Sequence, residues 1–208
     1  MTHDFDKSYW DEHWQQAQTS GSTAVRQSMP NPYVARETSD LEPGTALDAG
    51  CGEGAEAIWL ASTGWHVTAA DIASSALARA AERAAATGVT ERVRWVEADL
   101  STWTPETQYD LVMTHYAHPQ LPQLDFYDRI ANWVAPGGTL LIVGHLHTPA
   151  STGHNHHPPT EASATAKTIT ARLDAKTWQI NTAEEPTRTV PGRTVPLYDV
   201  VVRATRLR

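Results

Sequence analysis

The sequence has little of three features that each mark a particular class of protein. It has a single cysteine, Cys51, so a disulfide-stabilised scaffold is excluded. No run approaches the roughly 20 apolar residues that a membrane-spanning helix requires. The first residues contain neither the basic segment nor the apolar core of a secretory signal. We therefore expect a soluble, cytoplasmic protein without a membrane partner.

Basic residues are also scarce. Lys and Arg number 16 and Asp and Glu number 24, which gives a net charge of −8 when the histidines are neutral. Because contacts to phosphates supply most of the affinity for nucleic acids, we expect no nucleic-acid partner. The length of 208 residues suits one domain with a sizeable core.

From residue 43 onward, short apolar runs alternate with longer segments of helical periodicity. This alternation is typical of a parallel sheet built from β-α-β units. The expected strands are 46–49, 66–71, 93–99, 109–115 and 138–145, and the expected helices are 56–63, 74–87 and 121–135. A helix at 8–18 comes before them, and a long loop at 146–160, a helix at 161–174 and strands at 178–183 and 195–204 follow.

A glycine-rich loop follows the first expected strand and opens a helix. Gly50, Gly52 and Gly54 leave backbone N–H groups open to a ligand, because a Cβ would block close approach. The segment also fits the G-x-G-x-x-A pattern of nicotinamide dinucleotide folds, with Asp71 about 20 residues further on. However, Asp48 at the strand end would repel a pyrophosphate and suits a cationic ligand better.

The segment from Asp48 to Gly54 resembles motif I of the class I S-adenosylmethionine-dependent methyltransferases. Supporting marks follow in the family's order, at 71, 98–100, 109–112 and 136–138. The aromatic N-terminal helix and the segment 57–67 are similar to small bacterial methyltransferases of the tellurite-resistance and thiopurine types. The resemblance implies an α/β, Rossmann-like fold with seven strands in the order 3-2-1-4-5-7-6, the last antiparallel, and helices on both faces.

The resemblance also implies roles for the residues that hold the cofactor, S-adenosyl-L-methionine. Gly50, Cys51 and Gly52 would lie against its methionyl part, and Asp48 would bind its amino group directly or through water. Trp14 would cover the cationic sulfonium by a cation–π contact, although two tryptophans four residues apart more often pack into a core.

Two further acidic residues are expected at the nucleoside end of the cofactor. Asp71 would accept hydrogen bonds from the ribose hydroxyls, and Ile72 would pack on the adenine. Asp99 would accept from the adenine amino group, with Leu100 against the ring. For either aspartate taken alone, capping of a helix after a strand is the ordinary alternative.

Histidines gather where the methyl acceptor is expected. Thr114, His115 and His118 lie at the end of the fourth strand, and His145 ends the fifth. We expect Thr114 and His115 to flank the cofactor, and any of the three histidines could act as general base or position the acceptor. A packing or surface role is equally open for each. The histidines at 145–157 lack a cysteine or carboxylate that would complete a metal site, so no metal is expected.

The sequence therefore predicts one methyltransferase domain over residues 1–208. We expect an N-terminal helical cap at 1–40, a cofactor-binding core at 41–145, and a substrate-side loop with C-terminal strands at 146–208. The predicted activity is methyl transfer to a small-molecule acceptor, by a monomer or homodimer. An NAD(P)-dependent oxidoreductase and a non-catalytic S-adenosylmethionine- or metal-binding module remain the alternatives.

Overall fold

A mixed sheet forms the centre of the fold in the computed structural model, which describes residues 5–19, 29–146, 164–189 and 196–208. The strands follow the order β3-β2-β1-β4-β5-β8-β6, and β7 pairs with β8. β8 runs antiparallel to β5, β6 and β7, whereas the pairs from β3 to β5 are parallel. The strands are β1 Thr45–Ala49, β2 His66–Asp71, β3 Val93–Glu97, β4 Tyr109–His115, β5 Val134–His145, β6 Trp178–Glu184, β7 Thr187–Arg188 and β8 Leu197–Arg206.

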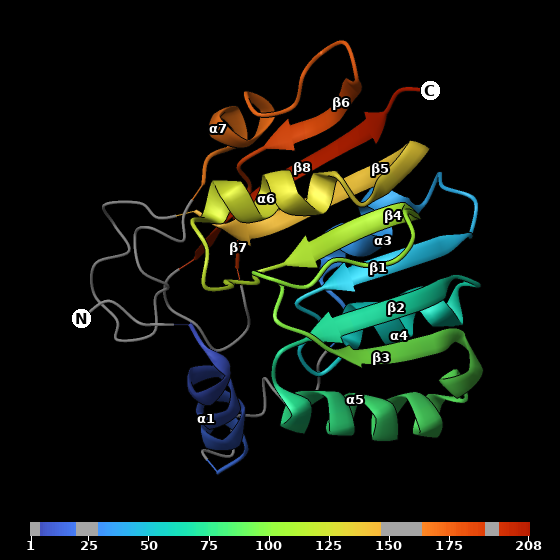
Figure 1. Cartoon of the computed structure of the whole chain (residues 1–208), viewed down its shortest axis with the longest axis vertical. Helices are drawn as coiled ribbons and strands as arrows, with labels where there is room; N and C mark the ends of the chain where they lie inside the picture. The colour runs from blue at the N-terminus through green and yellow to red at the C-terminus, as the bar shows by residue number, and fades with distance from the viewer. Residues whose placement is uncertain (1–4, 20–28, 147–163, 190–195) are drawn as a thin grey trace.

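Helices cover both faces of this sheet. In Figure 1, α6 lies in front of the sheet, and α3 and α4 lie behind it. The helices are α1 Lys7–Thr19, α3 Pro32–Thr38, α4 Ala55–Ser62, α5 Ser74–Thr87, α6 Gln123–Ala131 and α7 Ala166–Thr170, with a 3-10 turn η1 at Thr90–Arg92. None of the helices in the described ranges is long and apolar enough to cross a membrane. The predicted fold and strand order are confirmed, with β7 as one additional short strand.

Successive side chains along each strand point to opposite faces of the sheet, and so they form two separate cores. In β4, Leu111 and Met113 face the core beneath α3, α4 and α5, whereas Val112 faces the core beneath α6 and α7. Both faces are buried, so these strands are apolar on both sides, as parallel strands require. This arrangement leaves only the strand ends free to carry polar, ligand-facing groups.

Several predicted boundaries were wrong. The helix expected at 121–135 ends at Ala131, because Val134 pairs with Tyr109 and already belongs to β5. That strand was predicted to begin only at 138. The third strand ends at Glu97 rather than at residue 99.

The helix expected at 161–174 is shorter in its described part. Residues 161–163 lie outside the described residues, and α7 begins at Ala166, where the Thr165 side chain accepts a hydrogen bond from the backbone N–H of Thr168. α7 ends at Thr170, so the predicted final turn to residue 174 is absent.

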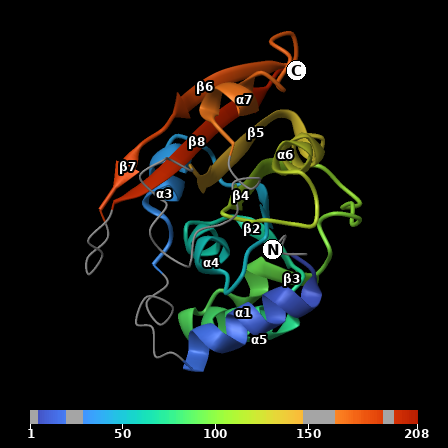
Figure 2. The same cartoon turned by 90° about the vertical axis from the view of Figure 1, so that its left-hand side faces the viewer.

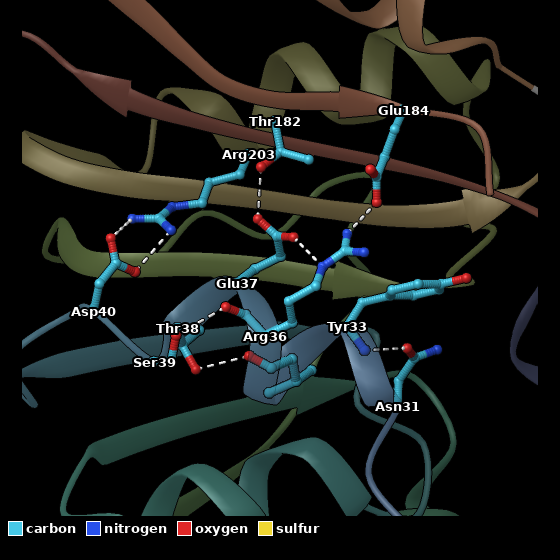
Figure 3. A network of polar contacts seen from close by, with 11 residues as sticks. Asn31, Tyr33, Arg36, Glu37, Thr38, Ser39, Asp40, Thr182, Glu184 and Arg203 are labelled. Atoms are coloured by element: carbon cyan, nitrogen blue, oxygen red, sulfur yellow. Dashed lines mark hydrogen bonds and ion pairs between the residues drawn. The ribbon is translucent and has the colours of Figure 1, made fainter.

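The N-terminal part of the chain contacts the sheet at two distant places. At one, α3 faces the antiparallel strands: Arg203 makes two hydrogen bonds of 2.8 Å with Asp40, and the Thr182 hydroxyl donates to Glu37 at 2.7 Å (Figure 3). Arg36 bridges Glu37 and Glu184 in the same network. Each ion pair of this network has at least one exposed partner, and such pairs contribute little individually, so the network mainly orients α3 on the sheet.

The second contact places α1 beside the carboxyl ends of the central strands. Figure 2 shows α1 in front of α5, and the Ser75 hydroxyl donates to Asp11 at 3.2 Å. The Lys7 ammonium donates to the backbone oxygen of Ile72 at 3.1 Å and to Glu97 at 2.7 Å. The strand order reverses between β1 and β4, which is where open α/β sheets bind ligands.

Candidate active site

A cavity of about 700 Å³ opens at this reversal point. Its walls come from α1, from the loop between β1 and α4, and from the ends of β2, β4 and β5. This volume lies in the ordinary range for small-molecule sites. The predicted site residues that line it are Trp14, Gly50, Cys51, Gly52, Asp71, Ile72, Asp99, Leu100, His115, His118 and His145.

The glycine loop wraps around the end of β2. The backbone N–H groups of Gly50 and Cys51 donate to the Ala70 carbonyl at 2.8 and 3.1 Å. Gly50 has φ +83°, and a Cβ there would lie 2.3 Å from the Cβ of Ala117. Both the backbone conformation and the close approach therefore require glycine at this position.

Trp14 from α1 lies directly over the loop. A Cβ on Gly52 would come within 2.6 Å of the Trp14 ring, and Gly52 has φ +51°. The Trp14 side chain is only half-buried. Its indole therefore covers the cavity wall from outside and belongs to neither sheet core.

We expect Trp14→Ala to lower the affinity for S-adenosylmethionine about tenfold, because the ring would no longer cover a cation in the cavity. The midpoint of thermal unfolding should fall much less than in Trp133→Ala, which removes a ring that is 5% exposed in the core beneath α6. Calorimetric titration and thermal scans of the two variants measure both effects. The reverse pattern would make Trp14 a core residue.

Asp71 connects the glycine loop to the start of α5. Its carboxylate accepts from the backbone N–H of Gly52 at 2.7 Å and from that of Ala73 at 2.9 Å, each through a different oxygen. Burial raises the pKa of Asp71, while these backbone N–H groups act in the opposite direction. Each oxygen can accept a further hydrogen bond, so the carboxylate can hold the loop and a ligand at once.

Asp48 and Thr114 lie beneath the site and do not line the cavity. Asp48 is 1% exposed, and its Oδ2 accepts no hydrogen bond from any described residue. Burial, and then the nearby charges of Glu56 and Asp71, raise the pKa of Asp48 well above its usual value. The Thr114 hydroxyl donates to the Ala49 carbonyl at 2.8 Å and so ties β4 to β1.

The cavity's other end is formed by Ile72, Asp99 and Leu100. Asp99 accepts from the backbone N–H of Ser101 at 2.8 Å and from its hydroxyl at 2.6 Å, through one oxygen. Leu100 is 6% exposed and belongs to the core beneath α6. An apolar wall with a carboxylate beside it can take a flat ring that carries an amino group.

The three predicted histidines also line the cavity, and two of them, His118 and His145, contact each other. His145 stacks on Tyr116 with ring centroids 4.2 Å apart, and on His118 at 6.1 Å. Burial lowers the pKa of His118, and the hydrogen bond with Gln123 opposes this shift. Burial also lowers the pKa of His115, with Glu56 opposing it. His115 and His118 are therefore neutral near pH 7.

Sequence reasoning missed several residues of the site. Glu56, in the first turn of α4, lines the cavity and accepts from the backbone N–H of Asn31 at 3.0 Å. The Tyr116 hydroxyl accepts from the Asn31 amide and donates to the fully buried Asp199, each at 3.0 Å. Tyr116 also has φ +56°, which is uncommon outside glycine. Asn31 and Asp199 are distant in sequence, so no local spacing could have indicated this group.

The cavity is strongly acidic. Five carboxylates line it and no Lys or Arg does so in the described part of the chain. One of them, Glu53, is ion-paired with Arg79 at 2.7 Å. No group of three or more potential metal ligands occurs among the described residues. His147, His154, His156 and His157 lie outside those residues.

Comparison with known proteins agrees with this geometry. Residues 46–138 match the family described as "Methyltransferase domain". A "Probable thiol methyltransferase 2" from Arabidopsis thaliana is 27% identical over 136 residues, which cover 62% of this chain and 60% of the relative. The chain therefore spans less than two thirds of that relative's length.

Two solved structures show the same fold at low sequence identity. The [4+2]-cyclase SpnF superposes with a TM-score of 0.73 and 15% identity, covering 100% of this chain and 98% of SpnF. The glycopeptide N-methyltransferase MtfA in complex with S-adenosyl-L-methionine gives a TM-score of 0.61 and 16% identity, covering 85% and 87%. Residues 46–138 therefore resemble a methyltransferase domain, and the chain shares its fold with a methyltransferase that binds S-adenosyl-L-methionine.

Proposed function

We propose that this protein transfers the methyl group of S-adenosylmethionine to a small-molecule acceptor. The acidity of the cavity around its glycine loop carries this proposal. S-adenosylmethionine is cationic at its sulfonium and ammonium groups, so the carboxylates attract it. The same carboxylates would repel the pyrophosphate of NAD(P), which is the main rival ligand.

The residues of the cavity fit the parts of this cofactor. Asp71 would accept from the ribose hydroxyls, and Asp99 from the adenine amino group, with Ile72 and Leu100 against the ring. Gly50 and Gly52 leave the wall open where a Cβ would intrude, and Cys51 lines the same wall between them. These residues of the cavity would therefore hold the nucleoside and the methionyl backbone.

The unpartnered oxygen of Asp48 lies below the glycine loop, near Glu56 and Asp71. Its charge would be compensated by an ammonium group above the loop. When bound, the cofactor supplies an activated methyl group, so the protein mainly has to align the acceptor and exclude water. Tyr116, His118 and His145 would form the acceptor's side of the cavity.

A thiol is the first acceptor to test, since one relative is named as a thiol methyltransferase. Purified protein would be incubated with methyl-labelled S-adenosylmethionine and a panel of thiols, phenols and amines. We expect S-adenosylhomocysteine to form in equal amount with a methylated thiol. A protein that binds the cofactor but methylates no acceptor would be a non-catalytic module, or an enzyme of another kind on this fold.

Location and assembly remain predictions from the sequence. We propose a cytoplasmic protein, monomeric or homodimeric, that acts without nucleic acid, and a division into a helical cap, a cofactor-binding core and a C-terminal substrate side. Size-exclusion chromatography with light scattering measures the assembly state.

Asp48→Asn should stabilise the free protein while weakening cofactor binding. Because burial raises the pKa of Asp48, the folded protein keeps this proton at pH values where the unfolded chain has already lost it. The free energy of unfolding therefore falls as pH rises from the unfolded-state pKa to the folded-state pKa. The amide removes this cost, and we expect a gain on the order of 1 kcal/mol in unfolding free energy at neutral pH. Urea unfolding against pH measures the change.

Binding of a cation would lower the pKa of Asp48, whereas burial raises it. A bound ammonium group favours ionised Asp48, so wild-type affinity should rise with pH and binding should release a proton. Calorimetry in buffers of different ionisation enthalpy measures that proton, and Asp48→Asn should reduce its release. An Asp48→Asn variant that is both less stable and equally tight in binding would contradict this role.

A further inference from the structure

One of the histidines at the acceptor end is held in a single tautomer. The Nδ1 atom of His118 lies 2.9 Å from the Oε1 atom of Gln123, the first residue of α6. The amide of Gln123 donates in turn to the Ala117 carbonyl at 3.1 Å and also hydrogen-bonds the Tyr127 hydroxyl. Because a carbonyl can only accept, the Ala117 contact requires the NH₂ group on that side and Oε1 on the side of the imidazole.

That orientation determines where the imidazole proton lies. Oε1 of Gln123 is itself an acceptor, so Nδ1 of His118 must carry the proton. Nε2 then holds a lone pair in the neutral ring. It is buried and has no hydrogen-bond partner among the described residues, while the side chain lines the cavity beside the rings of Phe5 and His145.

His115 differs in this respect. Both of its ring nitrogens are buried and neither has a hydrogen-bond partner in the described part of the structure. No neighbour therefore selects one tautomer of that ring. Of these two histidines, His118 is the one whose basic nitrogen is fixed by a described neighbour.

We propose that Nε2 of His118 is the general base for an acceptor that arrives as a neutral thiol, and that Gln123 positions it. This inference rests on the proposed function and assigns its acceptor class. The acidic cavity supports it, because an acceptor that was already an anion would be repelled by Glu12, Glu56 and Asp71. A neutral thiol avoids that repulsion but is a weak nucleophile until its proton is removed.

In the reaction, the S–H proton of the acceptor passes to Nε2 of His118. The sulfur lone pair forms the new carbon–sulfur bond to the methyl group. The bond from that methyl to the sulfonium breaks, and its electron pair stays on the departing sulfur, which becomes a neutral thioether. The imidazolium then loses its proton to water, and the hydrogen bond from Nδ1 to Gln123 is kept throughout.

Nitrogen-15 NMR of the imidazole rings tests the tautomer without any acceptor. In wild-type protein with S-adenosylhomocysteine added, His118 should show a protonated Nδ1 and an unprotonated Nε2 near neutral pH. In Gln123→Leu, the two tautomers should mix, and thermal unfolding shows whether that variant still folds. A proton on Nε2 of the wild-type ring would overturn the proposal.

Two thiols of different acidity test the catalytic step. At about pH 8, benzyl mercaptan is largely protonated, whereas thiophenol is ionised. We expect His118→Ala to lower kcat/KM for benzyl mercaptan by about a hundredfold or more, and that for thiophenol by less than about tenfold. Equal losses for both thiols would mean that His118 only shapes the cavity.

Gln123→Glu gives an independent signature. A carboxylate facing Nδ1 stabilises the imidazolium, so the acid limb of the kcat/KM profile for benzyl mercaptan should move to higher pH. An unmoved limb would overturn the positioning role. If wild-type protein binds S-adenosylmethionine in calorimetry but methylates neither thiol, the thiol class is wrong; if it binds no S-adenosylmethionine, the proposed function itself fails.

Discussion

Replacing Asp71 with alanine should lower the affinity for S-adenosylmethionine by about a hundredfold or more, or about 2.7 kcal/mol. The variant loses the acceptor expected to bind the ribose hydroxyls. It also loses the hydrogen bonds of 2.7 and 2.9 Å that the carboxylate accepts from the loop at Gly52 and from Ala73. Calorimetric titration of the folded variant measures the loss.

Asp110→Ala is the matched control. Asp110 also connects two elements, because its carboxylate in β4 accepts from the backbone N–H and the hydroxyl of Thr45 in β1, each at 2.8 Å. It lies at the start of β4, however, whereas the cavity is at the His115 end of that strand. Its removal should destabilise the protein while leaving affinity for the cofactor within about twofold. If both variants lost affinity in proportion to their loss of stability, Asp71 would be a structural residue only.

Gly50→Ala should destabilise the fold and the site together. The residue would be held at φ +83°, with its Cβ 2.3 Å from that of Ala117. Backbone strain and overpacking each cost about 1–3 kcal/mol, so we expect a loss of about 2–6 kcal/mol in unfolding free energy. Relief of the clash would move the loop or Ala117 into the cavity, so affinity should fall by about tenfold or more.

Gly88→Ala is the control that measures the cost of the left-handed backbone conformation without a steric clash. Gly88 ends α5 at φ +74°, and a Cβ there would meet nothing within 4 Å. Its cost should be that of the left-handed conformation alone, about 1 kcal/mol, with cofactor affinity unchanged. Urea unfolding and calorimetry compare the two variants. Equal stability losses would show that the loop yields to the extra methyl group without cost.

That the residues proposed to hold the cofactor come together could be predicted, because their signals are local. Asp48 and the glycines of the loop lie within seven consecutive residues, Asp71 is the last residue of β2, and Asp99 comes shortly after β3. In a parallel sheet, the carboxyl ends of neighbouring strands meet at one edge. Order along the chain therefore determined which of these residues would come together.

The acceptor half depends on contacts that no short pattern encodes. Tyr116 meets Asn31 and Asp199, which lie 85 and 83 residues away. The partner of His118 is close in sequence, but Gln123 was expected within a helix starting at 121, where its side chain had no assigned role. Only the position of the Ala117 carbonyl defines the amide's orientation.

The wrong prediction that this helix ends at 135, when it ends at Ala131, has a similar cause. Val134 lies within the helix expected at 121–135, because an apolar residue at that spacing fits the helical period. A strand buries the same side chain equally well, and pairing with Tyr109 decides between them. Short apolar segments near a turn do not separate the two by periodicity alone.

The central claim is that the cavity binds the methyl donor. The most direct test is parallel calorimetric titration of the purified protein with S-adenosylmethionine, S-adenosylhomocysteine and NAD⁺. We predict micromolar or tighter binding of the first two, its loss in Asp71→Ala, and no heat with NAD⁺. Binding of NAD⁺ with no response to S-adenosylmethionine would contradict the account and restore the oxidoreductase alternative.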